Sequence, residues 1–351
     1  MKNNKFGFAL IGYGGMGGWH TRMLMDLSDI IEIRGIYDID PARNKKAVAD
    51  GFNVYPTLED LLNDDSIDLV TVAIPNDDHK DVCIKAMNAK KHVICEKPVA
   101  LSSEELQQMI DAANKNGVKF SVHQNRRRDE DFLSAQKIVR DNTLGKVFNI
   151  ESRVHGSRGV PGDWRNQKKH GGGMVLDWGV HLLDQLLLIT DEKVVSVYAT
   201  LSHVTNDEVD DGFKTIITFA DGMTAHIEVG TSNFISYPRW YILGENGSAQ
   251  IDWEVKGKIV MVSDWENRDA VPVVTAAGLT KTMAPRTDDT IKEYPLPVIK
   301  ADCKDYYRNF VKAIKGEEEM LVTHAQVMRV MKLMEAILKS GETGEVVKEI
   351  I

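Results

Sequence analysis

The sequence predicts an α/β protein with a doubly wound parallel sheet in its N-terminal part and a second α/β part on a mostly antiparallel sheet. Strand and helix signals alternate over residues 1–120, which is typical of a parallel sheet with crossover helices. From about Gln124 the chain changes to longer segments of alternating apolar residues. At 351 residues the chain suits two domains, which we place at 1–123 and 124–351.

Each strand expected in the first part is a short apolar run, and several helices begin at a recognisable start signal. Pro41 suits the first turn of one helix, and Thr57 caps another with Asp60 near its start. Ser102 and Glu105 form a capping box for a third. In chain order we predict a strand at 6–11, a helix at 16–27, a strand at 31–37, helices at 41–49 and 57–62, a strand at 69–74, a helix at 80–88, a strand at 92–95, a helix at 102–114 and a strand at 118–122.

The second part reads as a meander with flanking helices. Asp221 and Gly222 form a two-residue hairpin signal between alternating runs. Residues 264–298 are rich in Thr, Pro and Asp and predict an extended irregular loop. The other expected elements are a helix at 130–140, strands at 147–154, 194–201, 212–219, 224–230, 241–243, 249–253 and 258–262, and helices at 302–315 and 324–340.

Composition excludes several classes of partner. The formal net charge is −9, whereas nucleic-acid-binding faces and segments attracted to anionic membranes are basic. No run approaches the roughly 18 apolar residues of a membrane span, and the apolar run after the basic start is too short for a signal peptide. We therefore expect a cytoplasmic protein that binds neither nucleic acid nor membranes.

The metal-ligating residue types are dispersed. Cys83, Cys95 and Cys303 are isolated and odd in number, which predicts reduced thiols and neither a disulfide framework nor a zinc site. The histidines form no HxxxH or HExxH pair. We expect no metal.

Residues 12–17 predict a dinucleotide site. This GxGxxG motif follows a strand and opens a helix, and Asp38 lies 21 positions past its last glycine. Gly12 permits a tight turn, Gly14 lets the backbone approach the pyrophosphate, and Gly17 lets helix and strand pack closely. Asp38 should accept hydrogen bonds from the adenosine ribose and repel a 2′-phosphate, which favours NAD over NADP, although Arg43 lies close enough in sequence to blur the preference.

Lys97 is a candidate catalytic residue. It lies just past a predicted strand and before Pro98, and ligands bind at the carboxyl ends of strands in open α/β sheets. Its ammonium group would favour alkoxide character in a reacting hydroxyl group. The alternative is an ordinary solvated lysine.

Asp177 and His181 form a second candidate pair. Their i, i+4 spacing places them on one face of a helix, about 5–6 Å apart. A histidine near its normal pKa can take a hydroxyl proton as hydride leaves, and Asp177 would orient the ring. Asp184 lies one turn further along, where a substrate contact and a structural role are equally plausible. A lone histidine in an apolar helix is otherwise a satisfied core group.

A glycine-rich loop offers candidate substrate contacts. Trp164 can stack on a sugar ring while Arg165 bonds hydroxyl groups, which fits a polyol or sugar substrate. The basic residues that follow, Lys168, Lys169 and His170, would instead suit a carboxylate or phosphate, or be solvated. Tyr237 is a further candidate that would reach the pocket from the sheet.

With these motifs, the chain resembles the glucose-fructose oxidoreductase, inositol dehydrogenase and MocA-like family over essentially its whole length. Besides the glycine motif and Asp38, the resemblance rests on Pro75-Asn76 with His79, Glu96-Lys97-Pro98, Asn125-Arg126-Arg127, 145–147, 163–165 and 171–184. It implies a Rossmann domain followed by a large, open, predominantly antiparallel sheet. The cofactor would lie between the two, and the outer face of the sheet would form a homodimer or homotetramer. Arg128 stands where such sequences often carry an aromatic residue.

The resemblance also extends the predicted sites. It implies cofactor contacts from the glycine motif and its neighbours, and from the strand ends that follow. The full cofactor set is Gly12, Tyr13, Gly14, Gly15, Met16, Gly17, Asp38, Arg43, Pro75, Asn76, His79, Glu96, Lys97 and Asn125. The substrate set is Lys97, Arg127, Trp164, Arg165, Asp177, His181 and Tyr237.

These observations predict an NAD-dependent oxidoreductase. Hydride would pass between nicotinamide and a secondary alcohol of a sugar, cyclitol or glycoside, with His181 as general base. Two alternatives remain open. One is a redox-neutral glycosidase with tightly held NAD, and the other is a non-catalytic dinucleotide sensor. Net release of NADH during turnover would distinguish the dehydrogenase from the redox-neutral glycosidase.

Overall fold

The computed structural model describes residues 5–266, 272–280 and 285–351. Its first unit is a five-stranded, wholly parallel sheet in the order β2-β1-β3-β4-β5. The strands are β1 (Phe6–Ile11), β2 (Ile31–Tyr37), β3 (Leu69–Val72), β4 (His92–Cys95) and β5 (Phe120–Val122). The helices are α1 (Gly15–Met25), α2 (Pro41–Ala49), α3 (Leu58–Leu62), α4 (His79–Asn88) and α5 (Ser103–Asn116).

The strand order explains where a ligand can bind in this unit. From β1 the chain moves to β2 on one side and then to β3 on the other, so the order reverses between β1 and β3. In open α/β sheets such a switch point opens a crevice beyond the carboxyl ends of the strands. The glycine motif follows β1 there, and residues 73–76 follow β3.

The second unit is an eight-stranded sheet in the order β15-β12-β11-β10-β6-β9-β8-β7. Its neighbouring strands are antiparallel except β6 and β9, which run parallel. The strands are β6 (Val147–His155), β7 (Val194–Ser202), β8 (Gly212–Phe219), β9 (Thr224–Gly230), β10 (Trp240–Gly244), β11 (Gly247–Asp252), β12 (Lys256–Val262) and β15 (Ile291–Tyr294), and a separate hairpin holds β13 (Val273–Thr275) and β14 (Gly278–Thr280). The helices are α6 (Glu130–Arg140), α7 (Val180–Ile189), α8 (Asp305–Lys315) and α9 (His324–Thr343).

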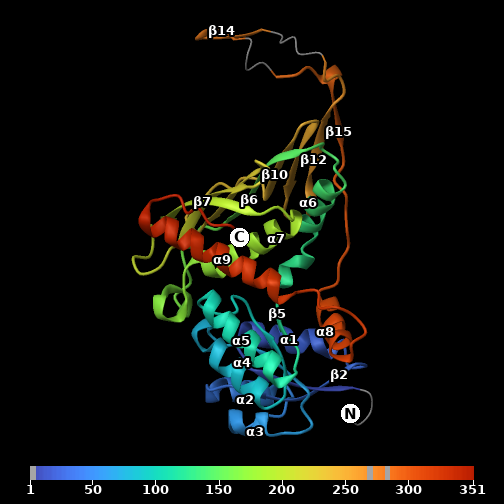
Figure 1. Ribbon diagram of the computed structural model, residues 1–351, viewed down its shortest axis with the longest axis vertical. Helices are drawn as coiled ribbons and strands as arrows, with labels where there is room; N and C mark the ends of the chain where they lie inside the picture. The colour runs from blue at the N-terminus through green and yellow to red at the C-terminus, as the bar shows by residue number, and fades with distance from the viewer. Residues whose placement is uncertain (1–4, 267–271, 281–284) are drawn as a thin grey trace.

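Helices α6, α7 and α9 cover one face of the large sheet and lie between it and the first unit (Figure 1). Helix α8 instead packs on the first unit, where the ring of Tyr307 lies 6.3 Å from that of Phe8. Tyr306 also donates a hydrogen bond to the Ser121 hydroxyl at 2.9 Å. The boundary at 123/124 stays a prediction, and a helix beyond it contributes to the core around the first sheet.

The fold class is confirmed, with one correction to the predicted elements. Residues 264–298 are not wholly irregular, because β15 pairs with β12 from Ile259–Tyr294 to Val262–Ile291 and extends the sheet. Hairpin β13–β14 lies between β12 and β15 in the chain and projects away from the large sheet (Figure 1). Residues 267–271 and 281–284 of the predicted loop lie outside the described residues. The pairing of β15 with β12 joins residues far apart in the sequence and leaves little local pattern. The prediction for 264–298 therefore rested on composition, which is typical of a loop.

Two smaller expectations also change. Ser102 caps α5 by accepting the Glu105 amide, but the Glu105 carboxylate accepts the amide of Leu101 and not that of Ser102, so the capping box is half formed. Within the described residues, the helical segment 168–189 is long and apolar enough to span a membrane. Of its most apolar window, 78% is buried inside the protein, which is expected of a core helix.

Candidate active site

A cavity of about 570 Å³ lies where the two units meet. The first unit contributes the turn after β1, the ends of β3 and β4, and the 3-10 turn η2 (Asn125–Arg128). The second contributes the loop with Trp164 and the start of the α7 region. Thirteen predicted site residues line it: Gly14, Gly15, Met16, Arg43, Pro75, Asn76, Glu96, Lys97, Asn125, Trp164, Arg165, Asp177 and His181.

The glycine motif forms a cradle with space on one side. A Cβ on Gly12 would lie 2.3 Å from the Ala73 carbonyl oxygen, and one on Gly17 would lie 2.1 Å from the Gly12 carbonyl oxygen, so both must be glycine. Nothing lies within 4 Å of a Cβ built on Gly15, which faces the cavity at the N-terminus of α1. Free amides and a positive dipole end at an open helix terminus fit a pyrophosphate.

Asp38 supports this cradle from behind. Its side chain is buried and accepts the Tyr13 amide at 2.6 Å and the Asp40 amide at 2.8 Å. Arg43, half-exposed and lining the cavity, places a guanidinium nitrogen 3.5 Å from the Asp38 carboxylate. Asp38 and Arg43 thus lie together at one end of the cradle. Gly12, Tyr13, Gly17 and Asp38 shape this end without lining the cavity.

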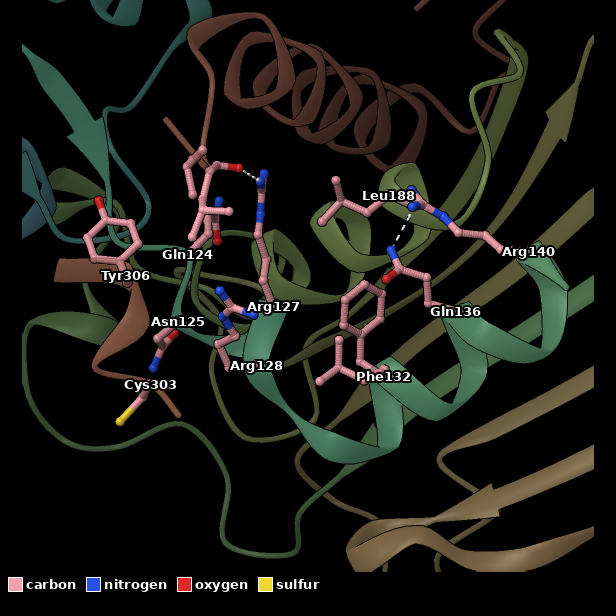
Figure 2. A pocket seen from close by; sticks show the side chains of 13 residues that line it. Gln124, Asn125, Arg127, Arg128, Phe132, Gln136, Arg140, Leu188, Cys303 and Tyr306 are labelled. Atoms are coloured by element: carbon pink, nitrogen blue, oxygen red, sulfur yellow. Dashed lines mark hydrogen bonds between the residues drawn. The ribbon is translucent and has the colours of Figure 1, made fainter. Parts of the chain in front are cut away.

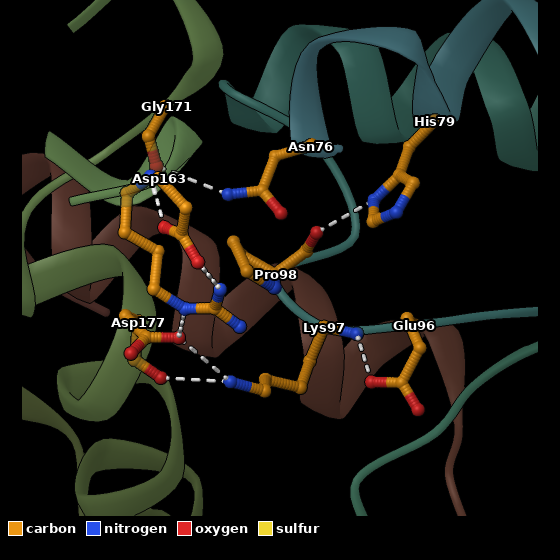
Figure 3. Close-up of polar contacts among 9 residues, drawn as sticks. Asn76, His79, Glu96, Lys97, Pro98, Asp163, Gly171 and Asp177 are labelled. Carbon is orange, nitrogen blue, oxygen red and sulfur yellow. Dashed lines mark hydrogen bonds and ion pairs between the residues drawn. The ribbon is translucent and has the colours of Figure 1, made fainter. Parts of the chain in front are cut away.

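Lys97 and Asp177 join the two units across the cavity. The Lys97 ammonium donates to the main-chain oxygen of Asp177 at 2.9 Å and to its carboxylate at 3.2 Å (Figure 3). Arg165 Nε lies 3.4 Å from the same carboxylate oxygen. Burial alone would raise the pKa of Asp177, but the two cations outweigh it and hold the pKa below its usual value. Asp177 is therefore a carboxylate at neutral pH.

Asp177 lies on a π-helical turn, η5 (Val175–Gly179), immediately before α7. The Asp210 carboxylate accepts the Met174 and Val175 amides, both at 2.9 Å, and so anchors the start of this turn. Gly173 has φ +102°, and a Cβ there would lie 2.2 Å from the other Asp210 oxygen. Single π-turns often mark functional sites, and this one sets the direction of the Asp177 side chain.

His181 follows on α7 and faces the same cavity. Its Nδ1 is buried and has no hydrogen-bond partner among the described residues. Burial, reinforced by the Lys97 and Arg126 cations, holds the pKa of His181 well below its ordinary value. The imidazole is therefore neutral at pH 7. The expected contact between Asp177 and His181 is absent from the described hydrogen bonds, because Asp177 is bound to Lys97 and Arg165 instead.

Besides Gly12, Tyr13, Gly17 and Asp38, three predicted residues lie outside the cavity lining: His79, Arg127 and Tyr237. His79 is fully buried, with its ring nitrogens 2.9 Å from the Pro98 carbonyl oxygen and 3.0 Å from that of Ile74, so it fixes two cavity-lining turns from behind (Figure 3). Arg127 makes a bidentate ion pair with Asp184 at 2.6 and 2.8 Å, which gives both residues a structural role.

Tyr237, the third, is exposed and lines a separate cavity of about 540 Å³ with Arg153, His155 and Trp253. The turn between β9 and β10 places it outside the cavity that holds Lys97 and His181, and its predicted substrate contact stays a prediction.

Sequence reasoning missed five residues that line the cavity: Ala73, Ile74, Arg126, Asp163 and Trp178. The Arg126 guanidinium lies 4.3 Å from the Trp178 ring centroid, and this ring meets that of His181 edge-on at 5.8 Å. Arg126 and Trp178 are chain neighbours of the predicted Asn125 and Asp177 and lie within the motifs on which the family resemblance rests, and these two signals could have found them.

Comparisons with known proteins agree with this geometry. Residues 6–124 match a family model described as "Oxidoreductase family, NAD-binding Rossmann fold", and residues 132–250 match the Gfo/Idh/MocA C-terminal domain. An uncharacterized oxidoreductase of Schizosaccharomyces pombe is 30% identical over 83% of this chain and 84% of its own. The NADP-dependent scyllo-inositol 2-dehydrogenase IolW of Bacillus subtilis is 26% identical over 95% of this chain and 93% of its own.

Two further relatives bear on fold and chemistry. The crystal structure of an NAD-binding protein from Listeria innocua superposes with a TM-score of 0.95 at 45% identity, covering 99% of this chain and all of that one. The Escherichia coli 2,7-anhydro-N-acetylneuraminate hydratase is 28% identical over 70% of this chain and 68% of its own. The two family models together span both units and more than half of the chain. This protein therefore belongs to the Gfo/Idh/MocA family and is an NAD-binding oxidoreductase.

Proposed function

We propose that the protein transfers hydride between NAD and a secondary alcohol of a sugar, cyclitol or glycoside, with His181 as general base. The observation that carries the proposal is the convergence of Lys97, Asp177 and His181 on one cavity that also holds the glycine cradle. A sensor that only binds dinucleotide has no need of this set.

The residues of the cradle fit the cofactor. Amides at the start of α1 would hold the pyrophosphate, while Asp38 and Arg43 would meet the adenosine ribose. Pro75, Asn76, Glu96 and Asn125 line the same cavity as Lys97. When bound, the nicotinamide supplies the hydride acceptor or donor.

His181 is suited to remove the hydroxyl proton. General base catalysis needs the neutral imidazole, and the lowered pKa provides it throughout the physiological range. The partnerless Nδ1 leaves the ring without a hydrogen bond that would fix its tautomer. A substrate hydroxyl group would be the first strong partner of this side chain.

Lys97 is suited to stabilise the alkoxide that develops as the proton leaves. Its ammonium group is held by Asp177 from the opposite unit, so its position depends on both units. A fixed positive charge at the reacting oxygen stabilises the transition state more than the neutral alcohol. Asp177 therefore acts through Lys97 and Arg165, and its position follows from η5.

The remaining cavity wall favours a polyhydroxylated ring. Trp164 and Trp178 offer aromatic surface, and Arg165, close to the Trp164 ring at 4.4 Å, offers guanidinium donors beside it. Aromatic faces with adjacent donors suit the apolar face and hydroxyl groups of a sugar or cyclitol. The names of the inositol dehydrogenase relatives support the same class.

A redox-neutral reaction is the second candidate, and the relative named as a hydratase favours it. The two are separated by incubating the enzyme with NAD and a panel of polyols, aldoses, sugar acids and glycosides. Stoichiometric NADH release supports the dehydrogenase. Product formation without net NADH supports the redox-neutral reaction, and no turnover across the panel would count against both.

We also propose a cytoplasmic homo-oligomer. Within the described residues no α-helix covers the outer face of the large sheet (Figure 1), and the strands expose Phe148, Tyr198 and Ile216. Association of two copies through this face would bury these side chains. Sedimentation of the purified protein as a monomer would contradict the proposal.

A further inference from the structure

A second cavity lies on the other side of the turn η2 from the active site. Its volume is about 230 Å³, and η2, α6, the end of α7 and the segments on either side of α8 enclose it. Figure 2 shows Arg128, Asn125 and Cys303 on one side of this cavity and Phe132 and Gln136 on the other. None of the reaction steps above uses it.

The cavity is electropositive. Three arginines line it, Arg127, Arg128 and Arg140, and its lining contains no carboxylate. Arg127 is neutralised by Asp184 and also donates to the Leu321 carbonyl. Arg140 is exposed, and among the described residues its guanidinium group donates one hydrogen bond, to the Leu188 carbonyl. Arg128 is half-buried and has neither an ion pair nor a hydrogen bond within the described part of the chain.

An arginine without a partner in a half-enclosed site points to an anion. Burying a guanidinium group costs free energy unless it is paired, and Arg is the side chain best suited to bind carboxylate or phosphate oxygens. Arg128 and Arg140 together offer donors that the protein itself leaves unused. A bound anion would satisfy them.

Two amides supply an independent observation. Gln124 is 3% exposed, and its Oε1 is buried without a hydrogen-bond partner among the described residues. The Oδ1 of Asn125 is in the same state. Buried amides without partners are uncommon in folded proteins. Both unpartnered atoms are acceptor oxygens of residues that line the cavity, so they would accept a hydrogen bond from a donor on the ligand, such as a hydroxyl group, and not from its anionic oxygens.

The remaining wall is apolar and sets the kind of anion. Phe132, Leu133, Leu188, Leu321 and Val322 line it. The volume is below the roughly 300–1,000 Å³ of pockets for drug-sized ligands. The occupant must therefore be small, with a charged end for the arginines and a hydrophobic body for this wall.

The turn η2 links this cavity to the active site. Asn125 lines both cavities, Arg126 lines only the active site, and Arg127 and Arg128 line only the second cavity. Gln185 of α7 also binds the Arg126 carbonyl at 2.7 Å, which ties the turn to the helix that carries His181. A ligand bound to Arg128 acts on the same turn that contributes Asn125 and Arg126 to the wall of the active site.

We propose that this cavity is an effector site for a small organic anion with a hydrophobic body, a carboxylate or a phosphate monoester. The ligand binds Arg128 and Arg140, packs on Phe132 and alters cofactor affinity through η2. Coupling between two sites is reciprocal, so NAD affects binding of the anion by the same factor.

Phenyl phosphate is the probe, titrated calorimetrically into the full chain saturated with NAD so that the cofactor cradle is filled. We expect saturable binding that is at least about tenfold weaker for inorganic phosphate and for phenol. Arg128→Gln should weaken it at least about tenfold. Lys137→Gln, on the same helix as Arg140 but outside the cavity lining, should leave it unchanged. Absence of saturable binding, equal binding by Arg128→Gln, or loss of binding once NAD is present would overturn the proposal.

Cys303 provides a second readout that needs no calorimetry. It lines the cavity and is half-buried, whereas Cys83 and Cys95 are buried. Phenyl phosphate should slow its alkylation by iodoacetamide, with Cys303→Ser as the blank. The dissociation constant of NADH, followed by fluorescence, should change at least about threefold with phenyl phosphate in the parent protein and not in Arg128→Gln. If phenyl phosphate leaves the rate of Cys303 alkylation unchanged, the site is refuted. If it leaves the dissociation constant of NADH unchanged, the effector role is refuted.

Discussion

Replacing Lys97 with methionine tests the central electrostatic argument. Methionine keeps the approximate length of the side chain but removes the ammonium group that binds Asp177 at 2.9 and 3.2 Å. A hydrogen bond to a charged group contributes about 1.5–3 kcal/mol, and about 1.4 kcal/mol corresponds to a tenfold change in rate. If Lys97 makes one such bond to the developing alkoxide, turnover should fall about 10- to 150-fold.

The pH dependence of the same variant carries a second expectation. The Lys97 cation helps to hold the pKa of His181 below its ordinary value. In the parent protein the rate of alcohol oxidation should therefore persist below pH 6.5, because the imidazole stays neutral there. In Lys97→Met the pKa of His181 should rise, and the acid limb of the pH–rate profile should move to higher pH.

Lys97→Arg is the matched control for charge. Arginine keeps the positive charge, so the acid limb should stay where it is in the parent protein. Its wide planar guanidinium replaces a compact ammonium group, so turnover should still fall severely. The assay is NADH formation on the substrate that the panel identifies, between pH 5 and 9, with NADH binding as the test of folding. Parent-like turnover and an unmoved acid limb in Lys97→Met would show that this lysine takes no part in the chemistry.

Three further expectations follow from the same site. His181→Ala should lower turnover about 100-fold or more with little change in NAD affinity, and near-normal turnover would exclude it as the base. Asp38→Ser removes the carboxylate beside Arg43 and should raise NADP affinity relative to NAD; calorimetry that finds the ratio unchanged would contradict this. Burial raises the pKa of Asp210 to about 7, so the folded protein should lose stability as pH rises from 4 to 7. Asp210→Asn should flatten that dependence in thermal unfolding, and parallel curves would refute it.

The elements of the first unit could be predicted from the sequence because short stretches of neighbouring residues specify each of them. Each parallel strand is a short buried run, and the glycine motif must follow β1 because only glycine fits against Ala73. Pro75, Asn76, Glu96 and Lys97, which follow β3 and β4, were predicted for the same reason, whereas Ala73 and Ile74 were missed because the predicted strand extended over them. Strand β15 was missed because its pairing with β12 joins residues some thirty positions apart, as Val260 and Glu293 do.

The errors at the site have a different cause. The i, i+4 spacing of Asp177 and His181 predicted their contact from regular helix geometry, but Asp177 lies on a π-turn. Its carboxylate also forms an ion pair with Lys97 of the other unit. Arg127 was likewise expected to meet substrate and is bound by Asp184 instead. Competition between partners from distant segments decides such contacts, and sequence spacing carries no information about it.

The active site depends on how the two units dock. Besides Lys97 and Asp177, Asn76 donates to the Gly171 carbonyl at 3.0 Å, and His170 lies 2.7 Å from the Asp77 carboxylate. These contacts all join the carboxyl ends of the first sheet to the segment that precedes α7. A change in docking would move Asp177 and His181 together relative to Lys97 and the cradle. In the proposed mechanism, the groups that act on the proton reach the groups that hold the cofactor only when both units are in place, so the interface between the units would be part of the catalytic apparatus.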